Sequence, residues 1–383
     1  MLTSFAVKDY RSLRNIRLPL ERLNVITGPN GSGKSSLYRS LQLLASVGQG
    51  RVISALANEG GLSSTIWAGP ESIAQSVRRG EHELEGTVRK QTISLKLGFA
   101  SEDFGYAIDL GVPIGGGTVF LSDPDIKTEV VWAGPVLRRA NVLAQRNGPL
   151  VTALGSRGER VSIKTDLASY DSMLTYAADA STTPELIELR ERMRGWRFYD
   201  QLRTDKYAPC RTPHVGTRTF ALAEDGSDLA AAIATIREIG DGAAFEHAIE
   251  DAFPGSRVEI LQQGGLFDIV LKQPGMLRSL RTAELSDGTL RFLLLAAALL
   301  TPRPPQLMVL NEPETSLHSE LISALGRLIL RASEDCQMIV VSHNAHLVEI
   351  LAGEGGQLLE LSKDWGETQV EGADPVTFNW PSR

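Results

Sequence analysis

Eight consecutive residues of the chain match the phosphate-binding pattern G-x-x-x-x-G-K-[ST] at every fixed position: Gly28-Pro29-Asn30-Gly31-Ser32-Gly33-Lys34-Ser35. Glycines tolerate positive φ angles, so successive backbone N–H groups of such a loop can point at one anion. The lysine of the pattern reaches the β- and γ-phosphates of a nucleoside triphosphate, and the hydroxyl that follows it binds Mg²⁺. The pattern therefore predicts a nucleotide site with Lys34 as a catalytic residue and Ser35 as a metal ligand. The predicted phosphate contacts are Asn30, Gly31, Ser32, Gly33, Lys34, Ser35 and Ser36.

The segments on either side of this loop are of the types that must position it. Leu23 to Thr27 is short, apolar and β-branched, which predicts a buried strand. After the loop, Leu37, Leu41 and Leu44 recur at the spacing of one helical face. A helix that begins near Gly33 would add the positive end of its dipole to the phosphate site. The alternative is a glycine turn between a strand and a helix with a solvated lysine, and the correct context on both sides argues against it.

Two further strand ends carry side chains suited to the other half of a nucleotide site. The apolar run Leu307 to Leu310 ends at Asn311-Glu312, and the run Gln337 to Val341 is followed by Ser342-His343. A carboxylate at such a position can act on the water that attacks the phosphate. Before both runs, Leu285-Ser286-Asp287-Gly288-Thr289 opens an apolar helix and offers a second arrangement that can bind an anion.

This order of motifs resembles the ABC-class ATPases, in which Walker A, signature, Walker B, D-loop and switch histidine follow one another. Leu285 to Thr289 resembles the signature LSGGQ and keeps its serine and second glycine. Two other stretches resemble the RecF/SMC-like branch, in particular its standalone "AAA family" predicted ATPases: Phe5-Ala6-Val7-Lys8-Asp9-Tyr10-Arg11-Ser12-Leu13 and Glu314-Thr315-Ser316-Leu317-His318. The resemblance covers both ends of the chain well and the middle poorly.

The resemblance implies a role for each matching position. Glu312 matches the catalytic glutamate that polarises water, and His343 matches the switch histidine that contacts the γ-phosphate. Ser286 and Gly288 match signature residues that bind the γ-phosphate of an opposite protomer, which implies a homodimer closed around ATP. The alternatives are a surface glutamate for Glu312 and an imidazole beside a helix N-cap for His343.

The chain departs from the family pattern at the metal position. Walker B normally ends in Asp-Glu, and Asn311 stands where the aspartate is expected. An amide oxygen can accept a hydrogen bond from a Mg²⁺-bound water but brings no charge. We therefore expect Asn311 to be a metal-site residue that is compatible with activity. The Q-loop glutamine stays open among Gln42, Gln49 and Gln91.

The predicted fold class is α/β, an ABC-type P-loop NTPase head with a central mixed sheet. An antiparallel β subdomain is expected from Ser76 to about Ile163, where short alternating runs such as Leu84 to Val88 and Thr92 to Leu97 lie between glycine turns. A helical lobe would carry the signature motif, and its first helices are expected at 170–180 and 184–194. The predicted division is lobe I, residues 1–170 plus 301–383, with both Walker motifs and the switch histidine, and lobe II, residues 171–300.

The amino-acid composition limits the classes of protein to which this chain can belong. Of the 383 residues, 42% are hydrophobic and 22% charged, which is ordinary for a globular protein. The most apolar run, Phe292 to Leu300, is far shorter than the roughly 20 residues that span a bilayer, so no membrane association is expected. The two cysteines, Cys210 and Cys336, have no metal-ligand spacing and suit a reducing compartment. Without a visible signal peptide, the expected location is the cytoplasm.

One local stretch could bind nucleic acid despite the net charge of −7. Residues 188–218 contain eight Arg or Lys against four acidic residues, interleaved with Trp196, Phe198, Tyr199 and Tyr207. Basic side chains beside aromatic rings can hold phosphates and stack bases. The alternative is that these arginines lie on a solvated face or pair within the protein.

The combined expectation is a Mg²⁺-dependent ATPase that dimerises around ATP and acts in DNA repair or another DNA-associated process. The alternative is an ATPase sensor or motor of an anti-phage defence system that works with a separate effector protein. A transporter motor is disfavoured by the stretch Glu314 to His318, by the 51–280 insertion and by the absence of apolar spans. A nuclease would have to be a separate chain, because the residues after the switch segment contain no visible carboxylate cluster.

Overall fold

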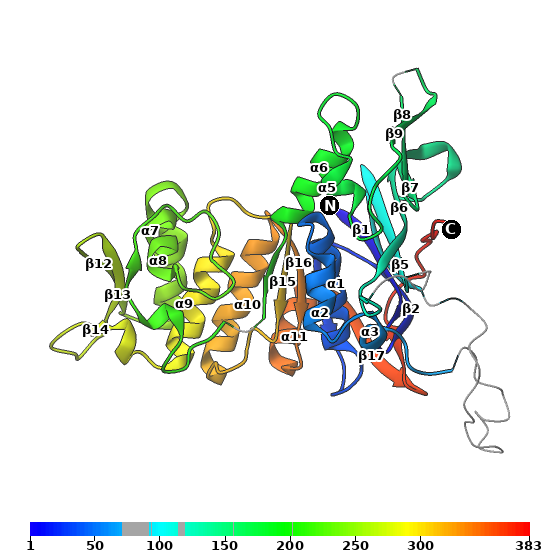
Figure 1. The fold of residues 1–383 in the computed structure, drawn as a ribbon. Helices are drawn as coiled ribbons and strands as arrows, with labels where there is room; N and C mark the ends of the chain where they lie inside the picture. Colours follow the sequence, from blue (N-terminus) through cyan, green and yellow to red (C-terminus); the bar gives the residue numbers. More distant parts are fainter. Residues whose placement is uncertain (71–91, 93, 114–118, 156, 201) are drawn as a thin grey trace, which may run out of the picture. The chain divides into compact units, whose positions relative to one another are not determined.

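The structure is a computed structural model that describes residues 1–70, 92, 94–113, 119–155, 157–200 and 202–383 (Figure 1). It divides into two compact units, each described here by itself. Unit 1 consists of residues 21–27 and 195–359 together with Met1. Unit 2 consists of residues 2–20, 28–194 and 360–383. Among the described residues, no helix is both long and apolar enough to cross a membrane.

Unit 1 is built on a parallel sheet whose strands are almost continuously apolar. Its strand order is β10 (Arg197–Tyr199), β15 (Leu307–Asn311), β16 (Gln337–Val341) and β3 (Leu23–Thr27). Nearly all residues of these four strands are buried, as expected for parallel strands covered on both faces. The exceptions are the last residue of β15, the last residue of β3 and the first residue of β10. Because the strands are parallel, their carboxyl ends lie along one edge of the sheet, and the phosphate-binding loop begins directly after β3.

Helices of unit 1 supply the rest of its core. The longest, α10 (Ser319–Ser333), packs against α8, α9 and α11, and α9 carries ten consecutive buried residues from Leu290 to Leu299. A small antiparallel sheet completes the unit. The bounds are α7 (Leu229–Ile239), α8 (Gly242–Ala252), α9 (Asp287–Leu299), α11 (Ala345–Gly353), β11 (His214–Val215), β12 (Arg257–Gln263), β13 (Leu266–Lys272), β14 (Leu280–Arg281), η2 (Pro209–Arg211) and η3 (Thr282–Glu284).

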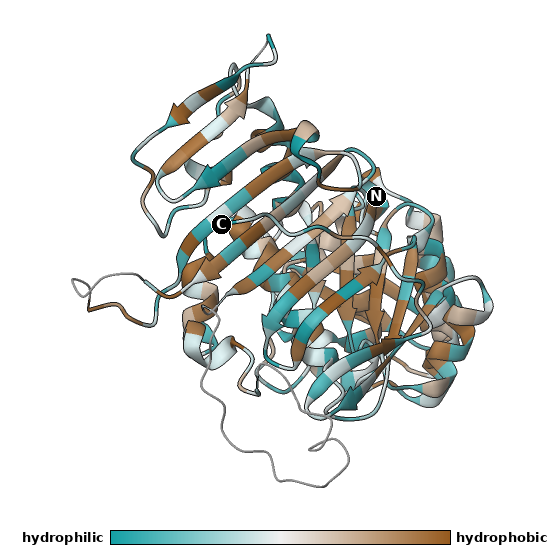
Figure 2. Ribbon diagram, turned by 90° about the vertical axis from the view of Figure 1, so that its right-hand side faces the viewer, coloured by the Kyte–Doolittle hydropathy of each residue, from teal (hydrophilic) through white to brown (hydrophobic). Residues whose placement is uncertain are grey.

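Unit 2 contains an eight-stranded antiparallel sheet in the order β2-β1-β4-β5-β6-β7-β8-β9. The central strands β4, β5 and β6 are buried over most of their length, whereas buried residues and partly or fully exposed residues alternate along β2, β7 and β8. Figure 2 shows the hydropathy of the strands. The bounds are β1 (Leu2–Tyr10), β2 (Leu13–Pro19), β4 (Leu95–Ser101), β5 (Phe104–Gly111), β6 (Asp125–Ala133), β7 (Val142–Asn147), β8 (Leu150–Leu154), β9 (Arg160–Lys164) and η1 (Arg139–Asn141).

The helices of unit 2 begin with α1 (Lys34–Gly48), which leaves the phosphate-binding loop and buries one face. It is followed by α2 (Val52–Asn58) and α3 (Leu62–Thr65), and later by α5 (Met173–Tyr176) and α6 (Pro184–Gly195). The chain ends with the hairpin of β17 (Gln357–Asp364) and β18 (Glu367–Glu371), of which the residues from Glu360 onward belong to unit 2.

The predicted fold class is confirmed, because a mixed α/β arrangement with a large antiparallel sheet is observed. Two local predictions are wrong. The strand expected at 92–97 begins at Leu95 and extends to Ser101, and the helix expected at 170–180 is the single turn α5. The segment before α5 is held by tertiary contacts instead, since Arg146 donates to the carbonyls of Ala168 and Asp171. The predicted strand Leu84 to Val88 lies outside the described residues, and the functional lobe boundaries stay a prediction.

Candidate functional site

The phosphate-binding loop has the backbone geometry that its glycines predict. Gly28, Gly31 and Gly33 have φ angles of 143°, 79° and 113°, and Gly33 is the N-cap of α1. A Cβ atom added at Gly28 would lie 2.2 Å from the carbonyl oxygen of Leu361, and one at Gly33 would lie 2.2 Å from the Thr368 hydroxyl. Only glycine fits these two positions. The exposed residues of the loop include Asn30, Gly31 and Ser35, while Ser36 is half-buried.

Lys34 is directed along the loop. Its Nζ donates to the carbonyl oxygens of Gly28 at 2.6 Å and Pro29 at 3.2 Å, and the residue is only 8% exposed. The hydroxyl of Ser32 is buried without a hydrogen-bond partner among the described residues. An ammonium group and an unsatisfied buried hydroxyl in one glycine loop are donors suited to phosphate oxygens.

A threonine far along the chain fixes this loop. Thr368 on β18 is 3% exposed, and its Oγ1 lies 2.8 Å both from the Ser32 carbonyl oxygen and from the hydroxyl of Ser12. The backbone N–H of Thr368 donates to the carbonyl of Ser12 at 2.9 Å. Nothing in the sequence around Thr368 indicates this role, because the contact joins residues more than 330 positions apart.

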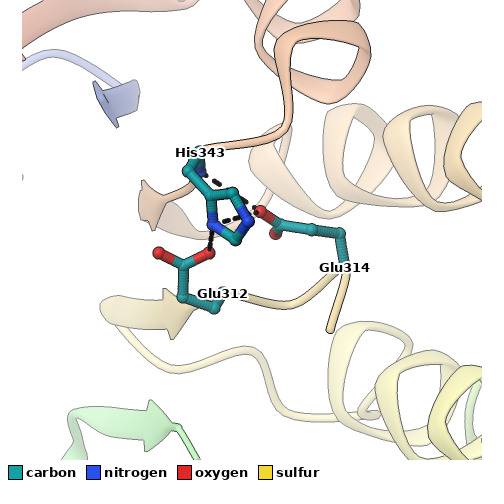
Figure 3. Close-up of side chains that lie close together, drawn as sticks. All are labelled: Glu312, Glu314 and His343. Carbon is teal, nitrogen blue, oxygen red and sulfur yellow. Dashed lines mark hydrogen bonds and ion pairs between the residues drawn. The ribbon is translucent and has the colours of Figure 1, made fainter. Parts of the chain in front are cut away.

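In unit 1, the strand ends bring Glu312 and His343 together, as Figure 3 shows. Glu312 follows β15, and His343 follows β16 by two residues. The Nδ1 atom of His343 and Oε2 of Glu312 form a hydrogen bond. This pairing places a carboxylate and an imidazole side by side, with Glu312 half-buried and His343 exposed.

Glu314, which the sequence analysis placed only in a family motif, anchors this pair. It is 6% exposed, and its Oε1 accepts from the Ser342 hydroxyl at 2.6 Å and from the backbone N–H groups of His343 and Asn344 at 3.2 and 3.3 Å. Burial, and next the negative charge of Glu314, raise the pKa of Glu312, while His343 opposes the shift. A carboxylate with a raised pKa accepts a proton more readily, which suits a group that polarises water.

The backbone at Glu312 is held in an unusual conformation. Its φ of 48° lies in the left-handed region, which is uncommon for a residue with a Cβ. Its N–H donates to the Val341 carbonyl at 2.8 Å, and its carbonyl accepts from Arg291 Nη2 at 3.2 Å. These tertiary contacts keep the glutamate in a conformation that costs on the order of 1–3 kcal/mol.

Arg291 on α9 is a second residue that sequence reasoning missed. It is 5% exposed and donates to three backbone carbonyls, those of Asp200, Leu202 and Glu312. Burial lowers the pKa of this guanidinium, whereas the charges of Asp200 and Glu314 raise it. Its buried position inside an apolar run gave no signal, since the run reads as core helix.

Asn311 lies at the end of β15 beside Asp200, which follows β10. Its Nδ2 donates to Asp200 Oδ1 at 2.7 Å. Asn311, the predicted metal-site residue, therefore has a carboxylate as its direct neighbour. Nothing in the sequence indicates this contact, because Asp200 stands out there only as one of the four acidic residues of 188–218.

The signature-like segment is held in place by hydrogen bonds and an ion pair. Ser286 is the N-cap of α9, and its Oγ accepts from the Thr289 N–H at 3.1 Å. Asp287, which replaces the first glycine of LSGGQ, pairs with Arg211 at 2.7 Å. Arg211 also donates to the carbonyls of Thr282, Ala283 and Leu285.

The signature glycine lies close to the D-loop segment. A Cβ added at Gly288 would be 3.0 Å from the Ser316 carbonyl oxygen, and Ser316 itself has a φ of 68°. Two of the predicted motifs are therefore in contact within unit 1.

The basic stretch 188–218 has only part of the predicted features of a nucleic-acid surface, because Tyr207 is 80% exposed with Lys206 over its ring whereas the other three aromatic rings are buried. Trp196, Phe198 and Tyr199 are 3%, 5% and 2% exposed, so these rings belong to the core and cannot stack bases. The arginines that form ion pairs with acidic residues are Arg190, Arg192, Arg194, Arg203, Arg211 and Arg218. The stretch also continues from unit 2 into unit 1. The alternative of pairing within the protein describes these residues better.

The residues present suit a magnesium nucleotide. Mg²⁺ takes oxygen ligands: within unit 2 the predicted metal residue Ser35 carries a hydroxyl, and within unit 1 the predicted metal residue Asn311 carries an amide oxygen. The glycine loop and the unpartnered Ser32 hydroxyl fit the phosphates. Glu312, Glu314 and His343 also offer ligand atoms within 4.8 Å of one another. Three donors contact Oε1 of Glu314, while its Oε2 is buried without a hydrogen-bond partner among the described residues.

Comparison with solved structures agrees with the fold. An SMC head domain described as bound to the C-winged helix domain of ScpA matches with a TM-score of 0.52 and 14% identity, covering 96% of this chain and 97% of that one. Two further SMC heads match less closely. For the Thermotoga maritima head the TM-score is 0.45, with 16% identity and coverage of 98% of this chain and 99% of that one. For the Pyrococcus furiosus head, described as bound to the C-terminal domain of ScpA, it is 0.49, with 13% identity and coverage of 96% and 95%.

A search of curated proteins finds no match. The family model described as "AAA domain, putative AbiEii toxin, Type IV TA system" matches residues 23–349, most of the chain. That range contains the phosphate-binding loop, the signature-like segment and both strand ends with Glu312 and His343. The chain belongs to this AAA-domain family, and its fold is similar to that of an SMC head domain.

Proposed function

We propose that this protein is a Mg²⁺-dependent ATP hydrolase that forms a homodimer around ATP. The observation that carries the proposal is the Glu312–His343 pair, which lies at the ends of the parallel strands β15 and β16. The next strand of the same sheet, β3, leads into the glycine loop that contains Lys34. Bound Mg²⁺ would neutralise charge on the phosphates. Asn30 to Ser36 would bind the phosphates, with Lys34 donating to them.

In this proposal Glu312 accepts a proton from the attacking water as the water oxygen bonds to the γ-phosphorus, while the bond from that phosphorus to the β,γ-bridging oxygen breaks and ADP leaves. With a proton on each ring nitrogen, His343 would donate from Nδ1 to the Glu312 carboxylate and from Nε2 to the γ-phosphate. Glu314 holds the backbone that carries His343 in place, because it accepts hydrogen bonds from the N–H groups of His343 and Asn344 after β16. The test is ATP hydrolysis by the wild-type chain with and without Mg²⁺.

Ser286 and Gly288 would bind the γ-phosphate held by the opposite protomer. A negative side chain at Asp287 would repel that phosphate, and its ion pair with Arg211 offsets the charge. Arg211 also holds three backbone carbonyls around the segment, so it would position the signature as well as neutralise it.

Replacing Arg211 by alanine is therefore expected to weaken the ATP-dependent dimer by about tenfold or more, in line with the loss of a positioning contact. Nucleotide binding by the monomer should stay unchanged, because the phosphate loop is intact. Sedimentation at several protein concentrations measures dimerisation, and titration with labelled ATP measures binding. Arg218→Ala, which removes an exposed arginine with a weaker pair at 3.6 Å, is the control. Equal dimerisation of both variants would contradict the role of Arg211.

The action on DNA and the action on an effector protein are rival extensions of this function. The burial of three of the four aromatic rings and the ion pairs of the arginines in 188–218 weaken the argument for DNA, although Tyr207 is exposed. The family description names a putative toxin of a toxin–antitoxin system, which supports the defence alternative over DNA repair. We therefore propose an effector protein as the partner, with the ATP-bound dimer as the form that it recognises.

ATP hydrolysis measured with and without duplex DNA, at low and moderate salt, separates the two. We expect equal rates and no shift of labelled DNA. A stimulation that falls steeply with salt would show phosphate contacts and return the proposal to DNA processing. In that case Arg194→Ala combined with Arg197→Ala should flatten the salt dependence.

A further inference from the structure

The end of β15 poses a chemical problem for a magnesium site. Asn311 is neutral, whereas a carboxylate at this position would attract the cation and the waters around it. We propose that Asp200, on the neighbouring strand end, supplies the negative charge that Asn311 lacks, so that the two side chains act together as one metal-binding pair. This inference rests on the proposed function as a Mg²⁺-dependent ATPase.

The register of the sheet puts the two residues side by side. Strands β10 and β15 are parallel, and Tyr199 is paired with Leu310. The next residue on each strand is Asp200 and Asn311, so both side chains emerge at the carboxyl edge of the sheet. Neighbouring strands are about 4.8 Å apart, which is within reach of a direct contact between short side chains.

The hydrogen bond between them fixes how each side chain is presented. Asn311 donates its Nδ2 to Asp200 Oδ1 at 2.7 Å. A carboxylate accepts and cannot donate when ionised, so the amide must turn its NH₂ group toward Asp200 and its oxygen away. The pair then offers an amide oxygen backed by a full negative charge one side chain away. Both residues are partly exposed, as a metal ligand and its neighbour must be.

Arg291 ties the backbone at Asp200 to the backbone at Glu312, the residue that follows Asn311. The guanidinium donates to the carbonyls of Asp200 and Glu312, the residues that carry the proposed charge and the proposed water-polarising group. One buried side chain thus fixes the spacing between the ends of β10 and β15. A competing explanation is that Asp200 serves only as a counter-charge for Arg291, and the experiment below separates the two.

The experiment measures metal binding without turnover. Each protein is saturated with a non-hydrolysable ATP analogue and titrated with Mn²⁺, followed by electron paramagnetic resonance, with Mg²⁺ as competitor. Four variants form the set: Asp200→Asn, Asn311→Asp, the exchange variant that combines both, and Asp205→Asn. Asp205 is an exposed aspartate of the same segment that pairs with Arg203 and serves as the control.

Asp200→Asn should raise the half-saturating metal concentration by about 10- to 100-fold, the usual effect of losing a group that supports a metal ligand. The exchange variant keeps one carboxylate and one amide in contact and should return to within about threefold of wild type. Asn311→Asp alone should bind metal more tightly than the exchange variant, because it retains Asp200 as well. The difference between those two proteins isolates the charge of Asp200 even if Asp200→Asn does not fold.

Unchanged metal binding in a folded Asp200→Asn protein would overturn the inference. So would equal binding by Asn311→Asp and the exchange variant, which would leave Asp200 as a counter-charge for Arg291 alone. Failure of the proposed function looks different, since the wild-type chain would then bind no ATP analogue at all.

Discussion

Replacing Lys34 by alanine is expected to abolish ATP binding while leaving the fold intact. The ammonium group is the one cation within the glycine loop, and its hydrogen bonds go to carbonyls of Gly28 and Pro29, which lie in the same loop. Hydrogen bonds between a charged donor and phosphate are about twice as strong as neutral ones, so their loss removes much of the binding energy. Calorimetric titration with ATP measures the loss directly.

The control is Arg39→Ala, which removes an exposed cation from the same helix α1 without touching the loop. It should bind ATP like the wild-type chain. Thermal unfolding of both variants should stay within a few degrees of wild type, because Lys34 lies in the glycine loop and outside the apolar core, and Arg39 is exposed. Undiminished ATP affinity in Lys34→Ala would show that the loop does not hold phosphates.

Replacing Glu312 by glutamine should leave ATP binding intact and slow hydrolysis by about 10²- to 10⁴-fold, the usual contribution of a general base. The amide keeps the size of the side chain and can still meet His343, but it cannot take a proton from water. Because the nucleotide then persists, the variant should accumulate as an ATP-bound dimer. Phosphate release measures the rate, and light scattering with ATP measures the mass.

Glu320→Gln is the matched control for this experiment. Glu320 is a highly exposed glutamate in the first turn of α10, with its side chain 89% accessible. Its loss should leave the hydrolysis rate within about twofold of wild type, as for most surface substitutions. A monomeric Glu312→Gln protein with ATP bound would contradict the dimer, and a wild-type rate would contradict the role of the glutamate.

The parts of the fold that could be predicted are those whose signal is local. The strands Leu23–Thr27 and Gln337–Val341 appear with the predicted bounds, since short apolar runs identify them without any tertiary information. The phosphate-binding loop was equally plain, because its glycines, lysine and serine are adjacent in sequence.

The residues that support the candidate site could not be found in this way. Thr368, Arg291 and Arg211 act through hydrogen bonds to the backbone of segments far away in the sequence. Such contacts leave no pattern near the residue itself, and Arg291 is hidden in an apolar helix. Asp200 could not be identified from the sequence for the same reason, because only the register of β10 against β15 brings it next to Asn311.

The basic stretch shows how composition alone misleads. Interleaved arginine and aromatic residues suit a nucleic-acid surface, and they equally suit a strand and helix end that bury their rings and pair their charges. Tyr199 illustrates the second outcome, as it is 2% exposed and donates its hydroxyl to the Leu222 carbonyl at 2.9 Å. Distinguishing the two requires burial, which periodicity over so short a strand does not reveal.

The central claim is that this chain hydrolyses ATP with Glu312 at the reacting water. The most direct measurement is phosphate release from ATP by the purified wild-type chain and by Glu312→Gln, each with Mg²⁺ and with a chelator, alongside ATP binding by both. We predict Mg²⁺-dependent release by the wild type, at least a hundredfold less by Glu312→Gln, and equal ATP binding by the two. ATP binding without any Mg²⁺-dependent release by the wild-type chain, or equal release by both proteins, would contradict the claim.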